Sequence, residues 1–162
     1  MDINLKLLEH NDEMEVFWEL FNTYIDELAK DSTHGDGIDL EYYYSEEYRG
    51  AIDRIRQREK NPIRINFILN EDKIAGFAMC QFLYNEGNTC ALMEFYLIED
   101  YRNKGIGKKV YQELENYIVN EGLTGVELTP TNSVNQRFWE SVGYSITDET
   151  DEENKRVFKK KL

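Results

Sequence analysis

The chain has 162 residues, of which 41% are hydrophobic and 13% aromatic, a composition that suits one folded domain with a sizeable core. It carries 32 Asp and Glu against 19 Lys and Arg, a formal net charge of -13 at pH 7. So acidic a chain argues against non-specific partners such as nucleic acid or an anionic membrane surface, because both attract positive charge. The acidic excess fits a cationic ligand, and it also fits a surface that is charged only for solubility.

Cysteine, histidine and hydropathy patterns set further limits. Cys80 and Cys90 each lie in an apolar, strand-like run, so we expect buried, reduced thiols. They form no metal-binding spacing, and His10 and His34 lie far apart, so we expect no metal site. The first ten residues are interrupted by charge and do not read as a signal peptide, and no run approaches 18 apolar residues. The expectation is therefore a cytoplasmic protein without a membrane partner.

The first half of the chain predicts one strand, two helices and two further strands. Residues 3–8 alternate between apolar and polar positions, as in a half-buried strand. A helix follows from about Asp12, because one apolar stripe recurs at spacings of three and four: Met14, Phe17, Trp18, Phe21, Ile25 and Leu28. The Gly-containing segment 31–39 interrupts the pattern, and a second helix is expected over 39–60, before Pro62. Strands over 63–70 and 73–84 are joined by a tight turn.

The second half predicts strands and helices in alternation. The expected elements are a strand over 89–97, a helix over 105–120, a strand over 126–128, a helix over 133–142 and strands over 144–148 and 155–160. The last two strands flank an acidic turn, D-E-T-D-E-E-N. The order β-α-α-β-β-β-α-β-α-β-β predicts one α/β domain over 1–162, with a mixed sheet covered by helices on both faces.

The run R-N-K-G-I-G-K-K, residues 102–109, opens the helix that follows the fourth predicted strand. Gly105 and Gly107 let an anion approach the backbone, and the first N–H groups of a helix have no partner within it. Four cations stand in these eight residues, where the chain average predicts about one. The run therefore predicts a phosphate cradle, and a solvated basic face at a helix start is the alternative. Val110 occupies the third glycine of a dinucleotide fingerprint, and G-K-[ST] is absent, so neither of those motifs applies.

Two motifs in this half match one family. The segment E-F-Y-L-I-E-D-Y-R-N-K-G-I-G resembles the [RQ]-x-x-G-x-[GA] motif of the GNAT superfamily of acetyl-CoA-dependent N-acetyltransferases. The segment T-P-T-N-S-V-N-Q-R-F-W-E-S-V-G-Y resembles the second motif of that superfamily. Together the two matches cover about 92–144. The resemblance implies a GNAT fold, a mixed and mostly antiparallel twisted sheet of about seven strands, with acetyl-CoA as cosubstrate and no metal.

The resemblance also implies roles for individual residues. The backbone N–H groups of the loop should hold the coenzyme pyrophosphate, and this loop comprises Asn103, Lys104, Gly105, Ile106, Gly107 and Lys108. Arg102 should shape the loop. The strand edge at Tyr96, Leu97 and Ile98 should pair with the pantetheine arm, with the N–H of Leu97 polarising the thioester carbonyl. Asn132 and Asn135 resemble pantetheine-contacting amides, although Asn132 also suits a helix N-cap.

The sequence departs from the family pattern where acid and base are expected. Trp139 stands where many members have a Tyr that protonates the departing thiolate, and an indole N–H cannot take that role. Met93 and Ala91 stand where some relatives carry a base. Glu94 matches one of two acidic residues found in polyamine acetyltransferases. It is either a base or amine anchor or a structural carboxylate, and a bulge in its strand would change the face on which it lies.

The acceptor side is predicted from charge. In this fold the loop and helix around 36–47 would form the acceptor wall, and they carry Asp36, Asp39, Glu41, Glu46, Glu47 and a cluster of Tyr. Carboxylates beside aromatic rings suit a cationic amine, and a solvated helix face explains them equally well. We expect transfer of acetyl to a primary amine, a small cationic one, by direct attack in a ternary complex. The alternatives are a protein N-terminal or lysine acetyltransferase and a non-catalytic acyl-CoA-binding regulatory module. A homodimer is compatible with the resemblance.

Overall fold

The computed structural model describes residues 2–30, 38–131 and 133–162. The strands are β1 (Ile3–Leu7), β2 (Ile63–Asn70), β3 (Lys73–Leu83), β4 (Thr89–Leu97), β5 (Gly125–Leu128), β6 (Ser145–Thr150) and β7 (Arg156–Lys161). The helices are α1 (Asn11–Lys30), α2 (Leu40–Tyr44), α3 (Glu46–Gln57), α4 (Ile106–Asn120) and α5 (Ser133–Ser141), with a 3₁₀ turn over Glu99–Tyr101. Most predicted elements are confirmed to within two residues at each end.

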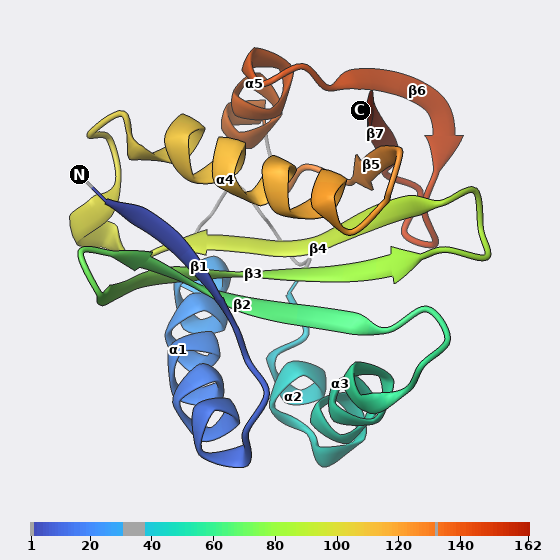
Figure 1. Ribbon diagram of the computed structural model, residues 1–162. Coiled ribbons are helices and arrows are strands. Elements are labelled where there is room, and N and C mark those ends of the chain that lie inside the picture. Colours follow the sequence, from blue (N-terminus) through green and yellow to red (C-terminus); the bar gives the residue numbers. More distant parts are fainter. Residues whose placement is uncertain (1, 31–37, 132) are drawn as a thin grey trace.

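The strands form a seven-stranded mixed sheet in the order β1-β2-β3-β4-β5-β7-β6. Every neighbouring pair is antiparallel except β4 and β5, which are parallel. Helices α1, α2 and α3 cover one face, and α4 and α5 cover the other (Figure 1). The predicted fold class and the helices on both faces are therefore confirmed.

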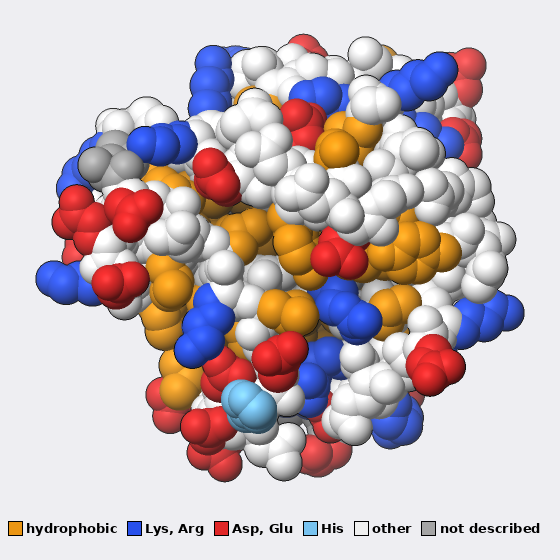
Figure 2. Space-filling model, viewed as in Figure 1, with side chains coloured by type: hydrophobic (Ala, Val, Ile, Leu, Met, Phe, Trp, Pro, Cys, Tyr) orange, Lys and Arg blue, Asp and Glu red, His pale blue; other side chains and the backbone are white. Residues whose placement is uncertain are grey.

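A separate hydrophobic core fills each side of the sheet. The core under α1 and α3 is aromatic, with Phe17, Phe21 and Phe77 all fully buried. The core under α4 includes Tyr111 and Leu114. Both cysteines lie in this second core as free, buried thiols, as predicted. On the surface, charged side chains of both signs surround exposed hydrophobic ones on the face shown in Figure 2.

The prediction of one helix over 39–60 is wrong. The helix is broken at Ser45, which ends α2 and begins α3. The N–H of Ser45 donates to the carbonyl of Tyr42 over 3.0 Å, and its Oγ accepts from the N–H of Tyr48 over 3.1 Å. A serine hydroxyl competes in this way with the helical hydrogen bonds of its own backbone. The second half, α3, ends at Gln57, three residues before the predicted end.

Strand β4 changes face at a bulge. Glu94 is opposite Met79 and Leu92 is opposite Cys80, so Met93 is an additional residue in β4. Leu92 therefore packs in the core under α4, whereas Tyr96 packs in the core under α1. Because the bulge precedes Glu94, it leaves Glu94 and Leu97 on opposite faces, as simple alternation predicts.

Strands β4 and β5 separate beyond the bulge. Their register covers only Thr89–Ala91 of β4. The second half of β4 therefore has β3 on one side and an opening on the other. This opening positions the candidate site.

Candidate active site

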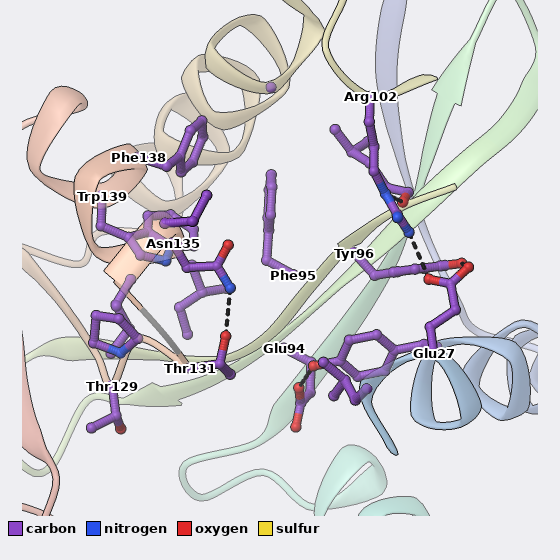
Figure 3. Close-up of a pocket in the computed structure, with 18 of the residues that line it drawn as sticks. Glu27, Glu94, Phe95, Tyr96, Arg102, Thr129, Thr131, Asn135, Phe138 and Trp139 are labelled. Atoms are coloured by element: carbon purple, nitrogen blue, oxygen red, sulfur yellow. Dashed lines mark hydrogen bonds and ion pairs between the residues drawn. The ribbon is translucent and has the colours of Figure 1, made fainter. Parts of the chain in front are cut away.

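A cavity of about 600 Å³ occupies the opening between β4 and β5. Its walls are the second half of β4, the loop after it, the segment 128–131 and the start of α5. Figure 3 shows Phe138, Trp139 and Asn135 on one side of the cavity, and Glu27, Tyr96 and Arg102 on the other. Seven predicted site residues line it: Glu94, Tyr96, Leu97, Arg102, Asn103, Gly107 and Asn135.

Other predicted residues lie outside this lining. Five line neither this cavity nor a smaller one beside it: Ile98, Lys104, Gly105, Ile106 and Lys108. The side chain of Ile106 is buried in the core, so only its backbone could reach a ligand. Asn132 and Asp36 lie outside the described residues.

The loop at the cavity mouth has the backbone that an anion site needs. Asn103 and Gly105 have φ of 59° and 73°, in the left-handed region, and Gly105 is the N-cap of α4. A Cβ on Gly105 would have nothing within 4 Å, so the space beside it is open. A Cβ on Gly107 would lie 3.1 Å from Cε1 of Phe138, which shows how closely the helix approaches the cavity wall. Open space, outward N–H groups and the helix dipole fit a diphosphate.

The backbone of Leu97 faces the opening. Ile98 donates its N–H to the carbonyl of Ala75 over 2.8 Å, so Leu97 occupies the alternate position at which N–H and C=O point away from β3. The Leu97 carbonyl accepts instead from Nε of Arg102 over 2.7 Å. The opposing Gly76 must lack a side chain, since a Cβ there would lie 1.9 Å from the carbonyl oxygen of Tyr96. The Leu97 N–H therefore faces the cavity, as the predicted role requires.

Arg102 is held by a carboxylate that the sequence did not single out. Its Nη2 lies 2.6 Å from Oε2 of Glu27 on α1, and Oε1 of Glu27 accepts from the Tyr96 hydroxyl over 3.1 Å. The guanidinium carbon lies 5.4 Å from the centre of the Tyr96 ring. Figure 3 shows the ion pair as a bridge between α1 and the segment after β4. Glu27 and Arg102 are 75 residues apart, so no local pattern joins them.

Glu94 is a half-buried residue of the cavity lining. Burial raises the pKa of its carboxyl from 4.5 to about 7, and a hydrogen bond from the Tyr24 hydroxyl partly opposes that rise. Burial and the Glu94 charge in turn hold the pKa of Tyr24 well above its ordinary value. A carboxyl with a pKa near 7 can exchange a proton with a ligand at neutral pH.

A second cavity of about 340 Å³ adjoins the first, and Tyr24, Met93 and Glu94 line both. Its rim is the turn between β6 and β7, at Asp151, Glu152, Glu153 and Lys155. The pKa of Tyr43, another lining residue, is raised to about 12 by burial and then by the charges of Glu94 and Glu153. The pKa of Tyr43 therefore depends on the charges of Glu94 and of the turn between β6 and β7.

The predicted acidic wall is corrected by this arrangement. Asp39 caps α2 through the N–H of Tyr42, and Glu41, Glu46 and Glu47 are exposed and line neither cavity. Within residues 39–47, Tyr43 is the residue that lines the second cavity. The acidic rim comes instead from 151–153, which the sequence identifies only as a turn. Sheet order brings this turn to the cavity, because β7 pairs directly with β5.

Trp139 is part of an aromatic wall. It is only 8% exposed and its ring centre lies 5.0–5.7 Å from those of Phe95, Tyr111, Phe138 and Tyr144. Tyr144 is buried and shares a 2.9 Å hydrogen bond with Tyr111, so it packs within the same wall. These packing contacts explain why a large indole stands at this position, and they require no role for it in proton transfer.

The described residues contain neither a candidate membrane-spanning helix nor a candidate metal-binding cluster. None of its helices is long and apolar enough to cross a membrane. Within residues 2–30, 38–131 and 133–162, no group of three or more His, Cys, Asp or Glu side chains could hold a metal ion.

Comparison with known proteins shows first the fold and then the family. The chain is similar over its whole length to solved acetyltransferase structures. The PaiA N-acetyltransferase of Thermoplasma acidophilum, in complex with coenzyme A, has 22% identity and a TM-score of 0.72, with 100% of each chain covered. An acetyltransferase of Streptococcus agalactiae has 20% identity and a TM-score of 0.70, covering 99% of this chain and 98% of that one. A GNAT-family acetyltransferase of Staphylococcus aureus has 16% identity and a TM-score of 0.71, with 99% of each covered.

The model of the acetyltransferase (GNAT) family matches residues 17–144. The chain therefore belongs to this family, and it is an acyltransferase. A search of curated proteins found no match.

Proposed function

We propose that this acyltransferase moves an acetyl group from acetyl-CoA to a small cationic primary amine, by direct attack within a ternary complex. The observation that carries the proposal is the position of Glu94, which lines both cavities and has a pKa of about 7. In this proposal the larger cavity takes the acetyl-pantetheine arm, and the smaller one takes the amine.

In this proposal the chain's own residues supply the groups for the reaction. The loop after β4 and the start of α4 would bind the diphosphate through N–H groups, and Asn135 would contact the pantetheine. The N–H of Leu97 would stabilise negative charge on the thioester oxygen. Glu94 would accept the proton that the amine loses as nitrogen bonds to the carbonyl carbon and the carbon–sulfur bond breaks. The thiolate is a tolerable leaving group, so solvent can protonate it.

Direct attack is supported by the surroundings of the cavities. Cys80 and Cys90 are buried in the core under α4, and neither is among the described residues that line the two cavities. A cationic acceptor is supported by the rim of the smaller cavity, where three carboxylates stand with one lysine. Lys155 pairs with Glu153 at 3.2 Å, and within the described residues neither Asp151 nor Glu152 forms an ion pair, so the turn carries a net negative charge.

A panel of amines, with coenzyme A release as the readout, tests the proposal. Small cationic amines should be acetylated, and Glu94→Gln should lower kcat by about tenfold or more, with the loss shrinking as pH rises because more amine is already neutral. The affinity for acetyl-CoA should be unchanged. A panel in which only peptides or proteins are acetylated would contradict the acceptor class, and coenzyme A binding without any transfer would support a non-catalytic module instead.

A further inference from the structure

Glu27 is a carboxylate in the larger cavity that the proposed chemistry does not use. It extends from α1, and both of its oxygens are engaged, one by the Tyr96 hydroxyl and the other by Arg102. It thus lies among groups that should bind a polyanionic cosubstrate. A negative charge there opposes such binding, so its presence calls for another explanation.

Arg102 connects Glu27 to the reacting end of β4. Its Nη2 binds Glu27 while its Nε donates to the Leu97 carbonyl over 2.7 Å. The two bonds use the rigid fork of the guanidinium, so fixing one end fixes the other. The Leu97 N–H and C=O belong to the peptide groups on either side of its Cα and point to the same side of an extended strand. A bond to the carbonyl therefore restrains the N–H through the φ and ψ of Leu97.

We propose that Glu27 is a positioning residue that orients the Leu97 N–H through Arg102. The inference rests on the proposed function in one respect, the role of that N–H in polarising the thioester. Glu27 also draws the Arg102 charge toward α1 and away from the diphosphate loop. The side chains of Glu27 and Arg102 are 37% and 39% exposed, so the pair contributes little to stability and its value lies in geometry.

This role predicts a loss of turnover without a loss of cofactor affinity. Removing the carboxylate frees Arg102 from its orientation, which should lower kcat. The same change removes negative charge near the diphosphate and releases a cation, which should leave coenzyme A binding unchanged or tighter. A purely structural role would instead weaken binding and turnover together.

The test compares Glu27→Ala and Glu27→Gln with Glu19→Gln, an exposed carboxylate two turns earlier on α1. For Glu27→Ala we expect kcat to fall by about tenfold, and Kd for coenzyme A by calorimetry to stay the same or fall by up to about threefold. Glu27→Gln keeps neutral hydrogen bonds and should retain most of kcat. Glu19→Gln should match the wild type. If Glu27→Ala does not fold, Glu27→Gln decides: most of the wild-type kcat with an equal or lower Kd for coenzyme A supports the proposal, and a higher Kd would overturn it.

A double-mutant cycle tests whether Glu27 acts through Arg102. In Arg102→Ala, a further Glu27→Ala change should have no additional effect on kcat, because the connection is already broken. Additive losses, or a wild-type kcat in Glu27→Ala, would overturn the proposal.

A readout without turnover separates this inference from the proposed function. The backbone amide resonance of Leu97 should shift in Glu27→Ala and not in Glu19→Gln. If the wild type acetylates no amine, the proposed function fails while this measurement still decides the positioning role. An unmoved Leu97 resonance would overturn that role.

Discussion

Glu94 and Trp139 line the same cavity, and their surroundings assign them different tasks. Glu94 has a hydrogen-bond partner in Tyr24 and a pKa raised to about 7, so it can change protonation state near neutral pH. Trp139 has aromatic rings on several sides and is nearly buried. At the scale of single residues, one side chain is suited to proton transfer and the other to packing.

Glu94 should make stability depend on pH. Because its pKa in the folded protein is raised above 4.5, protonation of Glu94 stabilises the folded state. This contribution to stability is fully present below about pH 4.5 and is lost as pH rises through about 7. At about pH 5, the free energy of unfolding of Glu94→Gln should therefore be nearly that of the wild type. At about pH 8 it should be larger than that of the wild type by about 1–3 kcal/mol. Denaturant titrations at both pH values measure this, with Glu19→Gln as control, and a pH-independent difference would contradict the raised pKa.

Trp139→Phe should separate packing from catalysis. The smaller ring leaves part of the aromatic wall unfilled, so the free energy of unfolding should fall by about 1–3 kcal/mol. Turnover should stay within about threefold of the wild type, since the indole takes no part in proton transfer. Thermal unfolding and steady-state kinetics check both parts, and a hundredfold loss of kcat in a folded variant would show that the indole acts in the reaction.

The sequence predicts candidate site residues where a local motif carries them, and it misses residues that only the fold brings to the cavities. The run around Arg102–Lys108 is contiguous, so its composition alone indicated an anion site. Glu27 and the turn at 151–153 reach the cavities from distant segments. Neither carries a local pattern that distinguishes it from an ordinary exposed carboxylate in an acidic chain.

At the scale of elements, predictions succeeded where one periodic pattern ended at a clear stop. The helix α4 was predicted almost to its ends, because its apolar stripe is bounded by Gly105 and Gly122. The break between α2 and α3 was missed because the apolar pattern continues across Ser45, from Tyr43 to Tyr48 and Ile52. A single capping hydroxyl outweighed that pattern, and hydrophobic periodicity does not report caps.

The two ends of α4 offer a matched pair of glycines. Gly105 and Gly122 have φ of 73° and 86°, and a Cβ at either position would meet nothing within 4 Å. Gly105→Glu and Gly122→Glu should therefore lose similar stability, about 1–2 kcal/mol, from left-handed backbone strain. Gly105→Glu alone should weaken acetyl-CoA binding, by about tenfold or more, because it places a carboxylate in the anion loop. Calorimetry on both folded variants measures this, and equal affinities would remove the loop from the cofactor site.

At the scale of the whole molecule, the net charge of -13 should act on substrates before they bind. An acidic protein attracts cationic amines over distances comparable with the Debye length. Raising ionic strength from about 20 mM to about 300 mM should therefore lower kcat/KM for a cationic amine, and more steeply for a diamine than for a monoamine. Kinetics with matched chain lengths measure the two slopes, and slopes of zero would show that overall charge does not steer the acceptor.

The hairpin of β6 and β7 combines a strand held by its neighbours on both sides with a turn whose side chains are largely exposed. Strand β7 lies inside the sheet beside β5, so its pairing is constrained. The turn that it carries is fixed by Asp151, whose carboxylate accepts from the N–H groups of Glu153 and Lys155, while the side chains of Glu152 and Glu153 are exposed. Exposed turn positions tolerate substitution at little cost in stability. If the smaller cavity takes the amine as proposed, its acidic rim can be altered at Glu152 and Glu153 without disturbing the strand pairing that holds the turn in place.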